Sequence, residues 1–461
     1  MSFLIALAAL AFLMFVAYRG YSVILFAPIA ALGAVLLTEP SAVPPMFSSV
    51  FMEKMVGFVK SYFPVFMLGA VFGKVIELSG FSKSIVSAVI GVLGRERAVL
   101  SIVVVCALLT YGGVSLFVVV FAVYPFAAEM FRQSGIPKRL IPCTVALGAF
   151  SFTMDALPGT PQIQNIIPTS FFKTTTWAAP WLGLIGSLFV LGCGLAYIQS
   201  RLRAAQVRGE GYGTDLQNEP EAFEAEELPN PWIAMLPLVV VGVANFLFTQ
   251  LIPRAYGAEH HITVGAKPII TQIPVVAAIW AVEGALLLGI LTVFLFAWRP
   301  VLARFADGSK AAVAGALLAS LNTASEYGFG GVIALLPGFE LIAGLLRSIP
   351  NPLINEAITV TVLAGITGSA SGGMSIALAT MSDTFISAAQ ANNIPLEVLH
   401  RVASMASGGM DTLPHNGAVI TLLAVTGLTH RVAYKDIFAI TMIKTTAVFV
   451  VIGVYYLTGL Y

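Results

Sequence analysis

Two runs of small residues interrupt apolar segments of this sequence: Leu109-Thr-Tyr-Gly-Gly-Val-Ser-Leu116 and Gly368-Ser-Ala-Ser-Gly-Gly-Met-Ser375. They divide the segments 98–130 and 354–391 into arms of about 15 residues, whereas a helix that crosses a bilayer needs about 20. We therefore expect two re-entrant helical hairpins, each with its Gly-Gly-x-Ser turn at membrane depth. Such a turn exposes backbone polar groups, which is tolerable only where the protein lines a wet cavity.

The composition places the whole chain in a membrane. Of its 461 residues, 58% are hydrophobic and 10% are charged, with a mean hydropathy of +0.91 and a net charge of +1. A soluble domain carries about 25% charged residues, so a soluble enzyme is excluded. The balance of charge also excludes nucleic acid as a partner, because phosphate binding needs a clustered cationic face. Cys106, Cys143 and Cys193 are too widely spaced to suggest a metal site or a disulfide framework.

The predicted fold is an all-α polytopic membrane protein with no cofactor. At about 20 residues per crossing, we expect spans near 2–17, 21–37, 62–79, 140–172, 177–199, 231–251, 271–298, 311–336, 401–428 and 436–459. Residues 1–200 are expected to form one repeat with a hairpin at 98–130 and a broken helix at 140–172. Residues 231–461 are expected to form a second, inverted repeat with a hairpin at 354–391 and a broken helix at 401–428. The polar stretch 201–230 is expected to be a solvated cytoplasmic linker.

Self-comparison supports two repeats. Gly112-Gly-Val-Ser115 matches Gly372-Gly-Met-Ser375, and Met154-Asp-Ala-Leu-Pro158 matches Met410-Asp-Thr-Leu-Pro414, at separations of 260 and 256 residues. The Lys and Arg positions follow the positive-inside rule if both termini lie outside the cytoplasm, and they then give the two hairpins opposite directions. Inverted repeats with broken helices are typical of secondary transporters.

Each repeat carries a Pro-containing break after its hairpin. Pro158 and Pro414 lack a donor N–H, and Gly159 and Gly417 admit unusual backbone angles, so each helix must open there. The second half of an opened helix begins with free N–H groups that attract anions. With the hairpin tips, up to four such helix starts can converge on a carboxylate. The candidate substrate-binding residues are Thr110, Gly112, Gly113, Ser115, Pro158, Gly159, Thr160, Gln162, Ser369, Ser371, Gly372, Gly373, Ser375, Pro414, His415, Asn416 and Gly417.

No Lys or Arg occurs from 357 to 391 or near Gly112, so we expect helix dipoles or a co-transported cation to neutralise the anion. This favours symport with H⁺ in preference to Na⁺. The candidate proton-coupling residues are Asp155, Asp411 and Glu326, because acids at membrane depth are costly unless they have a role. The alternative role of the two aspartates is to cap their half-helices, and that of Glu326 is hydrogen-bonded packing. Lys74 and Glu77, one turn apart, are expected to form an ion pair.

Two other functional classes remain as alternatives. Two aspartates on opened helices could form the shared-proton dyad of an intramembrane aspartyl protease, although such a dyad needs no convergence of helix ends. A channel is the other alternative, but hairpins from opposite faces would gate from both sides, as alternating access requires. The sequence therefore favours a transporter, not an enzyme.

The chain resembles the gluconate permease (GntP-type) family, within the ion-transporter superfamily. The resemblance rests on Phe66-Met-Leu-Gly-Ala-Val-Phe-Gly-Lys74, the 109–117 tip, Ala146–Pro161 and His415-Asn-Gly417, and it covers nearly the whole chain outside the linker. It implies proton-coupled uptake of sugar acids and small hydroxy acids through the bacterial inner membrane.

The sequence departs from the sugar-acid members at two places. Those members carry a Glu at the first tip, where this chain has Gly112, and an Arg in the second hairpin, where this chain has no basic residue. The chain is more similar to the 3-hydroxybutyrate permease branch. We expect a short-chain hydroxymonocarboxylate as substrate, with gluconate as the alternative. Many hairpin carriers pair, so a homodimer in the lipid bilayer is also expected.

Overall fold

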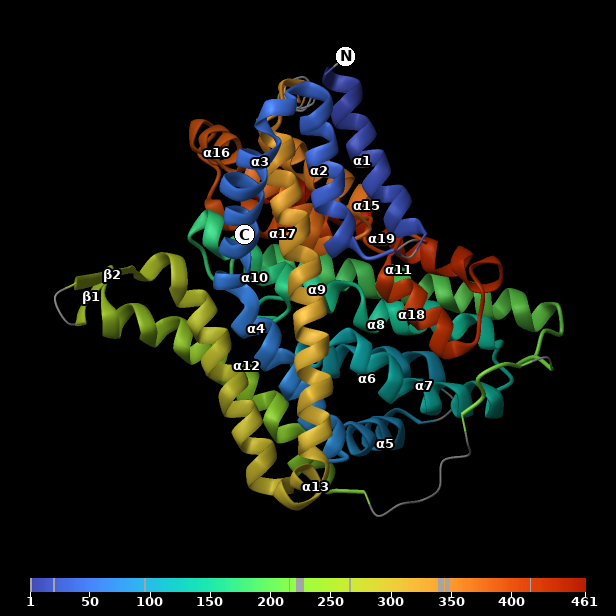
Figure 1. Cartoon of the computed structure of the whole chain (residues 1–461). Coiled ribbons are helices and arrows are strands. Elements are labelled where there is room, and N and C mark those ends of the chain that lie inside the picture. Colours follow the sequence, from blue (N-terminus) through green and yellow to red (C-terminus); the bar gives the residue numbers. More distant parts are fainter. Residues whose placement is uncertain are drawn as a thin grey trace.

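The computed structural model describes the chain except residues 1, 20, 95–96, 215, 221–227, 265–266, 339–343, 345–348 and 415. Its regular structure is almost entirely helical (Figure 1). The amino-terminal half contains α1 (Ser2–Tyr18), α2 (Val23–Thr38), η1 (Pro40–Ala42), α3 (Val43–Met46), η2 (Phe47–Phe51), α4 (Met52–Leu78), α5 (Phe81–Leu93), α6 (Ala98–Tyr111), α7 (Leu116–Gln133), η4 (Lys138–Leu140), α8 (Ile141–Ala149), α9 (Phe152–Asp155), α10 (Ile163–Phe172) and α11 (Pro180–Val207).

The carboxy-terminal half is similarly helical. It contains α12 (Pro231–Tyr256), β1 (Glu259–Val264), β2 (Lys267–Gln272), α13 (Ile273–Leu335), α15 (Pro352–Thr367), α16 (Ala370–Ala391), α17 (Leu396–Ser407), α18 (Gly417–Thr426) and α19 (His430–Thr458). Within the described residues, five helical stretches are long and apolar enough to cross a membrane: Pro40–Leu78, Pro180–Val207, Pro231–Tyr256, Ile273–Leu335 and His430–Thr458. The protein is thus a helical polytopic membrane protein, as the composition predicts.

The two predicted hairpins are present. Helices α6 and α7 meet at residues 112–115, and helices α15 and α16 meet at Gly368 and Ser369. In Figure 1, α6 and α7 lie in the lower part of the molecule, and α15 and α16 lie in the upper part. The hairpins therefore occupy different ends of the fold.

The second tip differs from the prediction. The turn is made by Gly368, whose φ is +67°, and not by the Gly372–Gly373 pair, which lies in the first turn of α16. These glycines serve close packing instead, because a Cβ at Gly373 would fall 2.1 Å from the backbone nitrogen of Ala364. Only a residue without a side chain lets α15 and α16 approach this closely.

Both predicted broken helices are also present. In the first, residues 156–162 separate α9 from α10, and in the second, residues 408–416 separate α17 from α18. Gly159 is essential to the first break, since its φ is +77° and a Cβ there would fall 2.3 Å from the Trp177 ring. The breaks at Pro158 and Pro414 are therefore where the sequence places them.

Helix α13 combines two predicted spans. Its backbone is non-helical at Ala297, near the end of the expected span 271–298 and before the expected span 311–336. Figure 1 shows one arm of α13 running from the β-hairpin to the bottom of the molecule and the other rising beside α4. The sequence analysis did not predict the antiparallel pair β1–β2, in which Glu259 lies opposite Gln272 and Val264 opposite Lys267.

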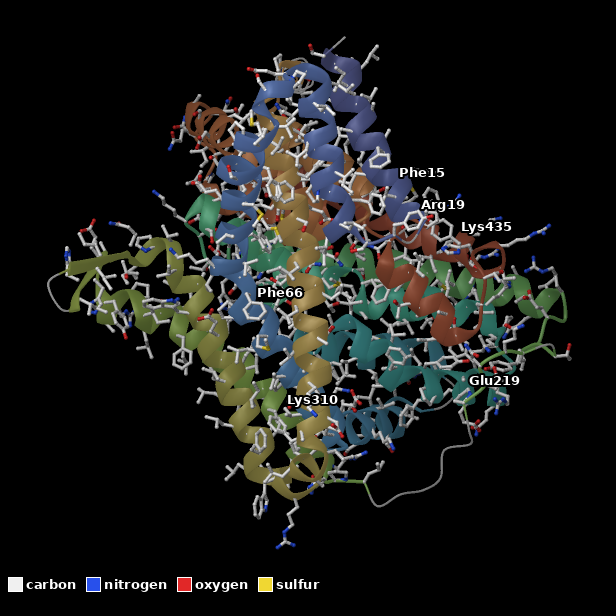
Figure 2. All side chains as sticks on the ribbon, in the orientation of Figure 1. Phe15, Arg19, Phe66, Glu219, Lys310 and Lys435 are labelled. Carbon is white, nitrogen blue, oxygen red and sulfur yellow. The ribbon has the colours of Figure 1, made fainter. Side chains whose placement is uncertain are left out.

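The described part of the predicted 201–230 linker makes hydrogen bonds to the surrounding helices. Helix α11 continues to Val207, seven residues into the predicted 201–230 stretch. Its described residues beyond α11 are docked on other helices: Tyr124 donates to the Asn218 carbonyl at 2.7 Å, and Asn218 donates to the Ala424 carbonyl at 2.7 Å. Glu219, labelled in Figure 2, pairs with Lys138 at 2.7 Å. The linker therefore fastens α7 to α18.

Candidate functional site

A cavity of about 1200 Å³ lies between the two halves of the chain. Helices α4 and α13, both hairpin tips and both helix breaks contribute to its lining. Phe66, one of the lining residues on α4, lies near the middle of the molecule in Figure 2. A wet cavity at the junction of the hairpins and the breaks is the setting in which such irregular backbone is tolerated within a membrane.

Four half-helices begin at this cavity. The N-cap residues of α7, α10, α16 and α18 are Ser115, Gln162, Ser369 and Asn416, and all four line the same space. The first N–H groups of a helix have no partner within that helix and carry a partial positive charge. The cavity therefore collects four positive helix ends, which together favour an anion.

The two halves of the protein differ in how these helix ends are capped. Asn416 accepts from the Ala418 N–H at 2.7 Å, and Ser369 accepts from the Gly372 N–H at 3.1 Å. Neither Ser115 nor Gln162 makes a side-chain cap bond. The Gln162 side chain instead donates to the Thr110 carbonyl at 2.7 Å and so ties α10 to the first hairpin. The first backbone N–H groups of α7 and α10 therefore lack the side-chain acceptors that those of α16 and α18 have.

The predicted site residues divide into those that line the cavity and those behind it. The first group is Gly113, Ser115, Gln162, Ser369, Ser371, Asn416, Gly417, Asp411 and Glu326. The second group, which does not line the cavity, is Thr110, Gly112, Pro158, Gly159, Thr160, Gly372, Gly373, Ser375, Pro414 and Asp155. His415 lies outside the described residues.

Residues of the second group shape the backbone. Gly112 packs so closely on Leu238 that a Cβ there would fall 2.5 Å from the Leu238 side chain. The Thr160 hydroxyl donates to the Thr153 carbonyl at 2.7 Å and so links the two sides of the first break. These residues position the helix starts without facing the cavity.

Asp411 is paired with a cation that the sequence analysis missed. Lys444 on α19 contacts the Asp411 carboxylate at 2.5 Å and donates to the Phe150 carbonyl at 2.8 Å. Lys444 is only 3% exposed. The sequence analysis considered Lys and Arg only near the hairpin tips, so it did not identify Lys444, which reaches the second break from a distant part of the chain. A lone Lys in an apolar span is the signal that could have revealed it.

Asp155 lies where the two breaks meet. Its carboxylate covers Gly408, where a Cβ would fall 1.7 Å from Oδ2, and its backbone carbonyl accepts from the Ser404 hydroxyl at 2.7 Å. Arg401, fully buried, donates to the same carbonyl at 3.2 Å and to the Ala178 carbonyl at 2.7 Å. Together with Lys444, these contacts join the first break to the second.

The capping interpretation of the two aspartates is wrong. Asp155 is the last residue of α9, and the N-cap of α10 is Gln162. Asp411 lies five residues before Asn416, which caps α18. Amide residues therefore occupy both N-cap positions, although only Asn416 makes a cap bond, while Lys444 pairs with the Asp411 carboxylate and Arg401 donates to the Asp155 backbone carbonyl.

Glu326 lines the cavity from α13 and is 3% exposed. Its Oε2 atom has no hydrogen-bond partner among the described residues. The predicted ion pair between Lys74 and Glu77, which also line the cavity, is confirmed with an Nζ–Oε2 distance of 2.8 Å. Glu326 thus differs from Glu77 and Asp411 in having no ion-pair partner in the part of the chain that the structure describes.

Comparisons with known proteins identify relatives among transporters. No family model matches the chain. The Uncharacterized transporter YxjC of Bacillus subtilis (strain 168) is 60% identical over 471 residues, covering 100% of both chains. The crystal structure of the Alcanivorax borkumensis YdaH transporter has a TM-score of 0.51 and 14% identity, covering 92% of this chain and 90% of that chain. The latter likeness shows a shared fold.

Proposed function

This chain belongs to the same family as the Bacillus subtilis transporter YxjC, and from that premise we propose that it imports a short-chain hydroxymonocarboxylate with protons by alternating access. The membrane in question is the bacterial inner membrane. The observation that carries the proposal is the convergence of four half-helix starts, with N-caps Ser115, Gln162, Ser369 and Asn416, on one cavity.

The less satisfied helix starts suit the substrate carboxylate. At α7 and α10 the first N–H groups lack side-chain caps, so a carboxylate there would supply the acceptors that the backbone needs. In the lining that the second half of the chain contributes, Ser369, Ser371 and Thr323 carry hydroxyl groups that match a substrate hydroxyl. The proposed substrate contacts are therefore Gly113, Ser115, Gln162, Ser369, Ser371, Asn416 and Gly417.

The charge of the lining favours a monocarboxylate. Lys74 and Lys444 are already paired with Glu77 and Asp411, so neither offers a free ammonium to a second substrate carboxylate. The resemblance to the 3-hydroxybutyrate permease branch agrees with a short acid. Gluconate remains the second candidate because a cavity of about 1200 Å³ has room for a longer monoacid.

The three candidate acids are not equivalent as proton carriers. Asp411 is held by Lys444, and Asp155 lies behind the lining. Glu326 faces the cavity, and no cation among the described residues pairs with it, so its charge is the least compensated of the three. We therefore favour Glu326 for coupling.

Counterflow in proteoliposomes tests the proposed function. Vesicles loaded with unlabelled 3-hydroxybutyrate should accumulate external labelled 3-hydroxybutyrate transiently, because a carrier exchanges the two faster than net flux dissipates the gradient. Empty vesicles provide the control. A channel or a protease gives no counterflow, so its absence for every monocarboxylate offered would refute a carrier of this class.

Competition identifies the substrate. Unlabelled 3-hydroxybutyrate should inhibit counterflow more strongly than gluconate, lactate or citrate. Strongest inhibition by gluconate would select the second candidate. Strongest inhibition by citrate would contradict the charge argument, because a tricarboxylate needs cations that the described lining does not offer.

A further inference from the structure

The cavity lining contains four charged residues among those described, namely Lys74, Glu77, Glu326 and Asp411. Lys74 and Glu77 neutralise one another, and Asp411 is neutralised by Lys444 at 2.5 Å. Among the described residues, Glu326 has no such partner. The net charge of the described part of the lining is therefore set by whether Glu326 carries a proton.

The Glu326 carboxyl lies on the start of α16. A Cβ at Gly372, in the first turn of that helix, would fall 1.5 Å from Glu326 Oε2, so the glycine leaves the space that the carboxyl fills. The unpartnered Oε2 atom is buried and faces the positive end of a 22-residue helix. The Glu326 carboxyl thus occupies the place at the start of α16 where an anion would otherwise bind.

The first half of the chain has no equivalent acid. Gly331 corresponds to Gly73, and at the same separation of 258 residues Glu326 corresponds to Leu68. The start of α7 is therefore left without a protein carboxylate, whereas the start of α16 has one. This asymmetry suits a carrier in which the substrate carboxylate binds at the start of α7 and the carboxyl that takes up the proton lies at the start of α16.

Other titratable groups near Glu326 do not offset its charge. The helices packed against α13 carry the following titratable groups: Glu53, Lys54, Lys60, Tyr62, Lys74 and Glu77 on α4, Arg254 and Tyr256 on α12, and Asp383 on α16. Tyr327 is its neighbour on α13, and Asp411 lies elsewhere in the cavity lining. None of these described groups donates a hydrogen bond to Glu326 Oε2.

Two carboxylates that share one buried cavity without a cation beside either of them repel each other and lose hydration, so a site of this kind holds one negative charge far more easily than two. We propose that the Glu326 carboxylate and the substrate carboxylate exclude one another as anions, so that each monocarboxylate is bound together with one proton on Glu326. This inference rests on the proposed function. A hydronium ion of the solvent gives up one O–H bond, its proton bonds to a Glu326 carboxyl oxygen, and water is left; no other covalent bond changes. Transport is then electroneutral.

Proton uptake on binding tests the exclusion directly. Purified full-length protein in a weak buffer with a pH indicator is mixed with 3-hydroxybutyrate, and binding is measured in parallel. At pH values above the titration of Glu326, the wild type should take up one proton per bound molecule, and its affinity should fall about tenfold per pH unit. At pH values below that titration, both the proton uptake and the pH dependence should disappear. Glu326→Gln should bind without proton uptake and with affinity independent of pH.

Glu283→Gln is the matched control, because Glu283 lies on the same helix but does not line the cavity. It should retain proton uptake. If Glu326→Gln fails to fold, Glu326→Leu is the second variant, because Leu68 stands at the corresponding position of the first half. It should also bind without proton uptake. Undiminished proton uptake by either Glu326 variant would overturn the inference.

Proteoliposomes separate failure of this inference from failure of the proposed function. Under an imposed potential with equal pH on both sides, wild-type uptake of labelled 3-hydroxybutyrate should not change. Uptake that the potential drives would overturn the inference and leave the carrier function intact. A wild type that neither binds nor exchanges any of the monocarboxylates would overturn both.

Discussion

At the scale of single residues, the ion pair between Asp411 and Lys444 dominates the centre of the molecule. Both side chains are buried, at 7% and 3% exposure, and Lys444 also donates to the Phe150 carbonyl. A buried pair adds little net stability compared with apolar residues, but removal of one partner strands an uncompensated charge. The pair therefore fixes how the two breaks meet.

Asp411→Asn should be strongly destabilising. The substitution leaves the Lys444 ammonium buried without its counter-ion, which costs about 3–5 kcal/mol. The thermal midpoint of the protein in detergent should fall accordingly. Asp411→Asn combined with Lys444→Met should recover most of the loss, since neither charge then remains. An unchanged midpoint in the single variant would show that the pair is not desolvated.

The residue scale is also where prediction from sequence is weakest. Asp155, Asp411 and Glu326 stand out as acids in apolar segments, but their partners cannot be read from spacing. Lys444 is 33 residues from Asp411, and Arg401 meets the Asp155 carbonyl across 246 residues. Such contacts depend on how helices pack, which local sequence patterns do not record.

At the scale of elements, the first hairpin tip is the most constrained turn. Gly113 has a φ of +96°, and a Cβ there would fall 3.2 Å from a Leu286 side-chain atom. Since Gly113 and Ser115 both line the cavity at the start of α7, the shape of this turn determines where the helix end points.

Gly113→Ala should impair transport. A side chain in this backbone conformation costs about 1–3 kcal/mol, and relief of the strain would shift the start of α7. We expect weaker substrate binding and a lower thermal midpoint. Gly192→Ala is the matched control, because Gly192 lies within α11 with no atom within 4 Å of a Cβ. Equal behaviour of the two variants would contradict a special role for the tip.

The linker end of α11 gives the fold a dependence on acidic pH. Arg139 donates from Nε and Nη2 to the two Glu210 oxygens at 2.6 and 2.9 Å, and it also pairs with Asp436 at 2.8 Å. Hydrogen bonding from Arg139 lowers the pKa of Glu210 below its ordinary value. Arg139 therefore joins the linker to α19.

The depressed pKa determines the sign of the pH effect. A carboxyl with a lowered folded-state pKa stabilises the fold at pH values above its unfolded pKa, and this contribution disappears as the pH falls through the folded pKa. The thermal midpoint of the wild type should therefore fall more steeply below about pH 4.5 than that of Glu210→Gln. The difference should be small because Glu210 is 33% exposed. Parallel pH profiles would contradict the assignment.

At the scale of the whole molecule, the sequence predicts the hairpins and helix breaks better than the packing contacts between helices. Interrupted apolar segments and repeated Met-Asp-x-Leu-Pro motifs are local features, and the hairpins and breaks that they predict are present. The second tip is displaced by four residues because Gly372 and Gly373 serve packing against Glu326 and α15, a demand that exists only in three dimensions. The docking of the linker likewise depends on tertiary contacts.

The central claim is that half-helix starts, not free cationic side chains, hold a small carboxylate between the two halves. A structure of the purified protein with 3-hydroxybutyrate bound tests this most directly. We predict that the carboxylate lies at the starts of α7 and α10, beside Ser115 and Gln162, with its hydroxyl toward Ser369. Density for the acid in the separate apolar pocket formed by Leu108, Trp177 and Phe246, with the central cavity free of it, would contradict the claim.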